Sequence, residues 1–125
     1  MMNIHESAED YLEAILMLGQ EKGYVRSVDI ALRLGVTKPS VSFAMKKLRE
    51  NGYILMDEEN LITLTPQGDD IARKILDRHT TIASFLEMLG VDKAVAKEDA
   101  CKMEHDLSDQ TYLAMRRFLR EIPKD

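Results

Sequence analysis

Residues 101–105 concentrate three kinds of side chain that bind metal ions. The run Cys-Lys-Met-Glu-His places a thiol, a carboxylate and an imidazole within one short segment. On a helix, Cys101, Glu104 and His105 would be three and four positions apart and would share one face. Thiolate, carboxylate and imidazole are the usual protein ligands of transition metals. Cys101 is the only cysteine, which excludes an intramolecular disulfide. We therefore interpret this segment as part of a metal site.

Three residues elsewhere in the chain are further candidate ligands. Asp10 and Glu13 stand at i and i+3 near the N-terminus, and His79 interrupts the apolar stripe of a later helical segment. Each has an ordinary alternative. Asp10 fits a capping box, Glu13 a surface acid and His79 a hydrogen-bonded core histidine, and Cys101 alone fits a small buried hydrophobe. The coincidence of all these residues favours the metal site.

Capping signals and apolar periodicity predict six helices that would position these residues. We expect helices at about residues 8–22, 28–34, 38–51 and 66–89, then a fifth that carries the Cys-x-x-Glu-His run, and a sixth that follows it. The expected N-caps are Ser7, Thr37, Asp92 and Ser108. The spacing of the second and third helices across Gly35-Val36 is typical of a helix-turn-helix.

A β-hairpin is predicted directly after the third helix. Two short apolar runs, residues 53–56 and 61–64, flank a polar turn at 57–60. A helix-turn-helix followed by a hairpin is a winged helix. The expected fold class is therefore mainly α, with an N-terminal winged helix-turn-helix at residues 1–65 and a C-terminal helical region at residues 66–125.

The charge distribution favours a polyanionic partner although the net charge is −5. Residues 26–51 hold six basic and two acidic side chains, a net charge of +4, and the rest of the chain carries −9. A basic segment on an acidic body suits DNA. The composition, 45% hydrophobic and 31% charged, is globular. The N-terminus lacks a signal region and no apolar run would span a bilayer, so we expect a cytoplasmic protein without a membrane partner.

The third helix has an outward face that could read DNA. With Val41, Met45 and Leu48 turned inward, Phe43 and Lys46 point outward. Serines and Phe43 suit base edges and thymine methyls, and the basic residues suit phosphates. Phe43 has the alternative of a core or dimer contact. The predicted DNA-binding residues are Arg26, Thr37, Lys38, Pro39, Ser40, Ser42, Phe43, Lys46 and Lys47.

Five motifs together resemble the DtxR/MntR family of metal-dependent bacterial repressors. They are residues 8–13, 37–42, 64–68, 78–79 and 100–108. The resemblance implies a homodimer built on the C-terminal helices, so that residues 66–125 would be a dimerisation and metal-binding domain. It also implies that the metal fixes the first helix and sets the spacing of the two recognition helices. By position, the implied ligands are Asp10, Glu13, His79, Cys101, Glu104 and His105.

The implied ligand set is a hybrid of two types within that family. Asp10 is similar to manganese-type members, whereas Cys101 is similar to iron-type members. A thiolate favours softer ions, and carboxylates suit manganese. The expected cofactor is therefore a divalent transition metal, manganese(II) or iron(II), with zinc or cobalt binding in vitro. Ala83 and Lys97 replace the carboxylate and histidine expected at an ancillary iron-type site.

The leading hypothesis is a metal-responsive repressor of metal-uptake genes that binds a palindromic operator as a homodimer. A winged-helix regulator that responds to an organic or redox effector is the main alternative. A winged helix that binds protein instead of DNA is another. A zinc hydrolase using His79, Glu104 and His105 is less consistent with the sequence, which lacks a His-Glu-x-x-His run. We therefore expect a regulator and not an enzyme.

Overall fold

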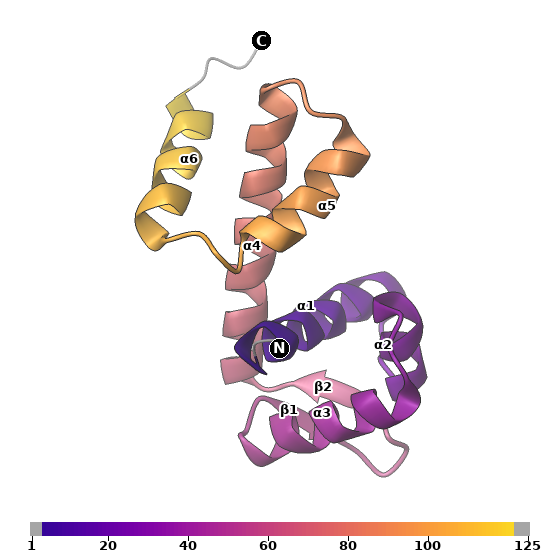
Figure 1. The fold of residues 1–125 in the computed structure, drawn as a ribbon. Helices are drawn as coiled ribbons and strands as arrows, with labels where there is room; N and C mark the ends of the chain where they lie inside the picture. The colour runs from indigo at the N-terminus through magenta and orange to yellow at the C-terminus, as the bar shows by residue number, and fades with distance from the viewer. Residues whose placement is uncertain (1–3, 122–125) are drawn as a thin grey trace. The chain divides into compact units, whose positions relative to one another are not determined.

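The structure, a computed structural model, describes residues 4–121 of the chain. These residues divide into two compact units on either side of the bond between Arg73 and Lys74. The elements in order are α1 (Ile4–Lys22), α2 (Ser27–Leu34), α3 (Lys38–Glu50), β1 (Ile54–Met56), β2 (Ile62–Leu64), α4 (Pro66–Met88), α5 (Lys93–Met103) and α6 (Asp109–Glu121) (Figure 1). The first unit holds α1 to β2 and the start of α4, and the second unit holds the rest.

The first unit is a winged helix-turn-helix, as the sequence predicts. Helix α2 ends at Gly35, whose φ of 66° lies in the left-handed region that glycine adopts without strain. Thr37 then caps α3 by accepting a hydrogen bond from the backbone N–H of Ser40. Strands β1 and β2 pair antiparallel with Leu55 opposite Thr63. They form the predicted hairpin, each strand one residue shorter than expected.

The core of the first unit joins helices to the hairpin. Ile30 of α2, Val41 and Met45 of α3, and Ile54 of β1 are almost fully buried. Outside this core, Lys22 forms an ion pair of 2.8 Å with Asp29, which links the end of α1 to α2. The hydrogen bond in this pair lowers the pKa of Asp29 and raises the pKa of Lys22.

The beginning of α4 is fastened to the residues that precede β1. The Thr65 hydroxyl donates a hydrogen bond of 2.7 Å to the Gly52 carbonyl and accepts one of 3.1 Å from the Gly68 N–H. The Thr65 N–H donates to the Tyr53 carbonyl at 3.1 Å. This close approach leaves no room for a side chain at Gly68, where a Cβ would lie 2.0 Å from the Tyr53 oxygen.

The second unit is helical. Ile75 and Ile82 of α4, Ala96 and Ala100 of α5, and Tyr112 of α6 are buried. The rings of Phe85 and Phe118 meet edge to face with their centroids 5.7 Å apart, a favourable aromatic geometry. The small alanines allow a helix neighbour to approach α5 closely. Among residues 4–121, no helix combines the length and apolarity needed to cross a bilayer.

Six predicted helices are present, but two of their ends were predicted wrongly. Helix α1 begins at Ile4, so Ser7 lies inside the helix and is not its N-cap. The residues before Ser7 continue the same helix.

Helix α5 ends at Met103 and does not carry the whole Cys-x-x-Glu-His run. The N–H groups of Asp106 and Leu107 both donate to the Met103 carbonyl, which closes the chain into a turn. Glu104 still has helical backbone angles, so it keeps the direction expected from the sequence.

We expect Gly68→Ala to lower the free energy of unfolding of the chain by about 2 to 3 kcal/mol, because the new methyl group meets the rigid Tyr53 backbone. Urea denaturation followed by circular dichroism measures this change. Gly19→Ala is the matched control, since its nearest atom would be Val25 Cγ2 at an ordinary 3.9 Å. Alanine is the better helix former, so this control should gain about 0.5 to 1 kcal/mol. Equal stability of Gly68→Ala and the parent would contradict the proposed close approach.

Candidate metal centre and nucleic-acid interface

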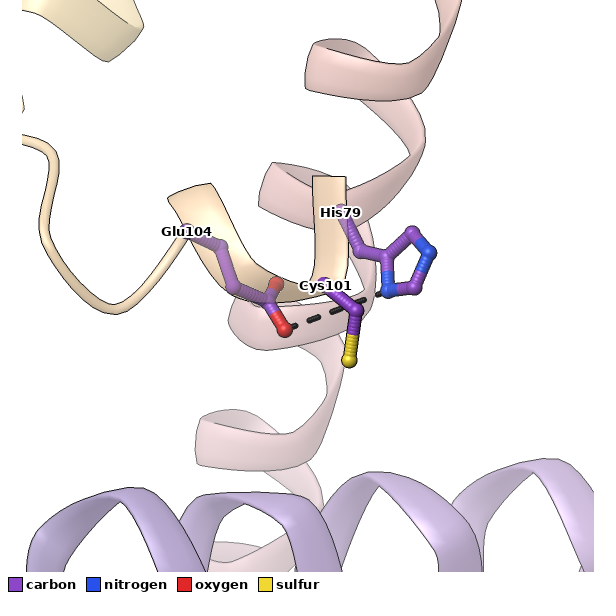
Figure 2. Close-up of side chains that lie close together, drawn as sticks. All are labelled: His79, Cys101 and Glu104. Carbon is purple, nitrogen blue, oxygen red and sulfur yellow. Dashed lines mark ion pairs between the residues drawn. The ribbon is translucent and has the colours of Figure 1, made fainter. Parts of the chain in front are cut away.

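Three candidate metal ligands converge within the second unit. One donor atom each from His79, Cys101 and Glu104 can be chosen so that all three lie within 4.8 Å of one another. His79 Nδ1 is 3.9 Å from Glu104 Oε1. Figure 2 shows the imidazole and the carboxylate directed toward one another, with the Cys101 side chain beside them. Helix α4 supplies the histidine, and the end of α5 supplies the other two.

A fourth candidate ligand lies beside the same carboxylate. His105 Nε2 is also 3.9 Å from Glu104 Oε1. Glu104 is 6% exposed, whereas the Cys101 residue is exposed. The carboxylate is thus held in a buried position between two imidazoles, and the thiol stands at the open side.

These donors fit a divalent transition metal. Metal–ligand distances of about 2.0–2.3 Å put two donors of one ion roughly 3.3–3.8 Å apart. Separations of 3.9 Å and at most 4.8 Å therefore need only small rotations of the side chains. The donor set is two imidazoles, a carboxylate and a thiol, which suits iron, cobalt or zinc through the sulfur and manganese through the oxygen.

Arg78 is a structural residue that the sequence reasoning missed. Its guanidinium donates to the carbonyl oxygens of Glu104 at 3.2 Å and Leu107 at 2.9 Å, and to the Asp109 carboxylate at 3.0 Å. It also lies over the Tyr112 ring, 4.8 Å from the ring centre. The signal in the sequence was an arginine directly before His79 on an otherwise apolar helix face, but only the folded chain shows its partners.

The remaining two predicted ligands belong to the first unit. Asp10 and Glu13 stand three residues apart on α1, and Glu13 is 7% exposed, which is unusual for a simple surface acid. Between them, burial raises the pKa of the Tyr11 hydroxyl, and the charge of Asp10 raises it further. Their membership of the ligand set stays a prediction.

The predicted DNA-binding residues lie on the surface of the first unit. All nine, from Arg26 to Lys47, are exposed, and the opposite side of α3 buries Val41, Met45 and Leu48. Phe43 is 65% exposed, so it is not a core residue. The ammonium of Lys47 lies 5.2 Å from the centre of its ring. The two side chains thus form one exposed apolar and cationic surface.

Three residues of that set, Arg26, Thr37 and Ser40, form side-chain hydrogen bonds within the first unit. The Thr37 hydroxyl donates a hydrogen bond of 2.9 Å to the Ser40 hydroxyl while it caps α3. The Arg26 guanidinium donates to the Glu59 carbonyl in the hairpin turn at 3.3 Å. Arg26 therefore links the start of α2 to the turn of the β-hairpin, in addition to any phosphate contact.

A cavity of about 410 Å³ lies elsewhere in the first unit. Ile15 and Gly19 of α1, Ile62 of β2 and Arg73 of α4 are among the residues that line it. None of the predicted ligands or DNA-binding residues lines the cavity. The candidate metal ligands are therefore not part of the lining of this cavity.

Two family models match the chain, and together they cover almost all of it. Residues 3–59 match the iron dependent repressor N-terminal DNA binding domain. Residues 65–125 match the iron dependent repressor metal binding and dimerisation domain. The first match contains α1 to β1, and the second contains the four candidate ligands of the second unit, His79, Cys101, Glu104 and His105.

Individual relatives are similar along most of the chain. The transcriptional regulator MntR of Salmonella typhimurium is 39% identical over 116 residues, which are 93% of this chain and 74% of that protein. The solved structure of IdeR from T. acidophilum has a TM-score of 0.79 and 28% identity, and the match covers 94% of this chain. The manganese regulator SloR has a TM-score of 0.79 and 29% identity over 92% of this chain. The chain spans 55% and 54% of these two solved chains.

We expect Glu104→Gln to weaken divalent-metal binding by more than about 100-fold, since even groups that only support a ligand cost about 10- to 100-fold. Titration of the chelator-treated protein with manganese(II) or cobalt(II), followed by calorimetry, measures this affinity. Glu98→Gln is the matched control, because Glu98 lies on α5, the helix that Glu104 directly follows, but is exposed and paired with Lys102 at 3.8 Å. Equal losses in both variants would show a general charge effect and contradict the assignment of Glu104.

Proposed function

The chain belongs to the iron-dependent repressor family, and on that premise we propose that it is a metal-activated repressor of genes for metal-ion uptake and homeostasis. This family consists of transcriptional regulators, not enzymes, in agreement with the sequence prediction. The chain carries the DNA-binding domain of the family and its metal-binding and dimerisation domain. We propose that it binds a palindromic operator as a homodimer in the cytoplasm, with the domains divided at residues 1–65 and 66–125.

The convergence of His79, Cys101 and Glu104 is the observation that carries this proposal. Three different metal-ligand types meet within 4.8 Å in the unit that matches the metal-binding domain. A thiol, a buried carboxylate and an imidazole within this separation are three ligand types that transition metals bind. We propose that these three residues and His105 hold the metal. Asp10 and Glu13 join the set on their chemistry and their family positions.

The proposed mechanism is a shift of population. The metal binds better to the conformer that binds DNA, and by linkage it raises DNA affinity by the same factor. Binding requires the Cys101 thiolate and neutral imidazoles at His79 and His105. The conformer that binds the operator is therefore populated only when enough metal is present to occupy these side chains.

We propose iron(II) or manganese(II) as the physiological metal. The thiol of Cys101 favours iron(II), cobalt(II) or zinc, and the carboxylate ligands suit manganese(II). SloR, which is described as a manganese regulator, is a structural relative. Cobalt(II) and zinc are expected to bind in vitro, because occupancy there follows the affinity of the ligand types and not the availability of each metal in the cell.

Exposed apolar side chains on the second unit support a dimer. The exposed fractions of Met88, Leu89, Val95, Leu113 and Phe118 are between 47% and 65%. Large exposed apolar side chains are frequent at protein–protein contacts. We propose that a second copy of the chain covers part of this surface.

Removal of metal should abolish specific operator binding, and a divalent metal should restore it. Fluorescence anisotropy of a labelled operator, measured under anaerobic conditions after chelation, would follow the titration with manganese(II), iron(II), cobalt(II) and zinc. Cys101→Ala should lose the response to metal while circular dichroism shows a folded protein. Binding that is indifferent to chelation would favour an organic effector instead.

On the proposed DNA face, Phe43→Ala should weaken operator binding by about tenfold, within the range of about 1–3 kcal/mol for one mismatched base pair, and should leave nonspecific binding almost unchanged. Lys46→Ala should weaken both kinds of binding and reduce the slope of log affinity against log salt by about one. Anisotropy at several salt concentrations measures both effects. Lys93→Ala is the control, since Lys93 is exposed at the start of α5 and outside this face. An unchanged salt slope in Lys46→Ala would contradict the phosphate contact.

A further inference from the structure

We propose that Arg78 is a positioning residue of the metal centre, which sets the place of Glu104 and His105 relative to His79 without binding the metal. This inference rests on the proposed function, because it assigns a role toward the same metal site. It extends that function to a residue that carries no ligand atom. All of the contacts that support this role lie within the second unit.

The cap of α5 and the turn after it receive hydrogen bonds from outside the helix. A helix leaves its last carbonyl groups without partners inside the helix. At this end, the carbonyls of Glu104 and Leu107 accept hydrogen bonds from the same nitrogen of Arg78, at 3.2 and 2.9 Å. The guanidinium therefore fixes the backbone of the turn that carries Glu104 and His105. Any change in that turn would move two of the proposed ligands.

Arg78 is also adjacent in sequence to His79, the proposed ligand on α4. It precedes His79 on α4, so its own backbone moves together with that imidazole. The guanidinium ties α4 to the turn after α5, and the His79–Glu104 donor separation of 3.9 Å spans the same two elements. One side chain thus controls the distance that a metal ion must bridge.

The start of α6 locks the guanidinium in its orientation. Its other terminal nitrogen donates to the Asp109 carboxylate at 3.0 Å, and its plane lies over the buried Tyr112 ring. The Arg78 side chain is 19% exposed, and Asp109 is 90% exposed. Lysine cannot replace this fork, because an ammonium is a point charge on a flexible stem.

Cobalt(II) titration of the full chain tests the proposal, with absorbance reporting both affinity and thiolate coordination. We expect Arg78→Gln and Arg78→Lys to weaken cobalt(II) binding by about 10- to 100-fold, the range found for groups that orient metal ligands. The d–d bands of the bound ion should shift in position or intensity, because the ligand geometry is altered. Asp109→Asn keeps both carbonyl contacts and should have a much smaller effect.

Phe85→Leu separates positioning from general stability. It weakens the aromatic contact of Phe85 with Phe118, in the same unit but away from the ligands. We expect it to lower the melting temperature as Arg78→Lys does, yet to bind cobalt(II) with parental affinity and spectrum. Equal loss of affinity in the two variants would overturn the proposal, as would parental affinity and spectrum in Arg78→Lys.

Glu104→Gln distinguishes failure of this inference from failure of the proposed function. If Glu104→Gln and Cys101→Ala bind cobalt(II) like the parent, the metal site itself is wrong. If these two variants lose binding and the Arg78 variants do not, the metal site is supported and the positioning role of Arg78 is contradicted. Loss of binding in both groups, with parental binding in Phe85→Leu, supports both.

Discussion

The hydrogen bonds from Arg78 to the turn after α5 are the interaction on which the second unit depends. Helix α5 stops at Met103, and the carbonyls of the turn that follows it need hydrogen-bond donors. A single guanidinium donates to two of the carbonyls in the following turn and to the first residue of α6. The consequence is a fixed turn in which the Glu104 carboxylate lies 3.9 Å from Nδ1 of His79 on α4.

The candidate metal site and the candidate DNA-binding face differ in whether their polar side chains are buried or exposed. In the first unit, an apolar core under α3 leaves its serines, lysines and Phe43 exposed, so that charge and shape are presented to solvent. In the second unit, the polar groups are turned inward: Glu104 is buried and His79 largely so. A carboxylate and an imidazole at this separation can act together as ligands of a cation. The chain therefore combines a candidate metal site with a surface that suits DNA.

Much of the fold could be predicted from the sequence because local signals agree with tertiary packing. Thr37, Asp92 and Ser108 cap helices as expected, since each side chain accepts a hydrogen bond from a backbone N–H of the first helical turn. The hairpin followed from two apolar runs around a polar turn. The start of α1 and the end of α5 were predicted wrongly. The exact ends of a helix depend on individual hydrogen bonds, and residue propensities do not specify these.

For the candidate site too, some features follow from the sequence alone and others depend on the tertiary structure. The sequence by itself determined the ligand types, their spacing around Cys101, the basic segment from residue 26 to 51, and the family resemblance, because these follow from residue identity and order. Only the tertiary structure decided that His79 meets Glu104 at 3.9 Å, that the run passes beyond the helix end, and that Arg78 holds the turn. These contacts join residues more than twenty positions apart, and their distances are set by how helices pack, which no local pattern encodes.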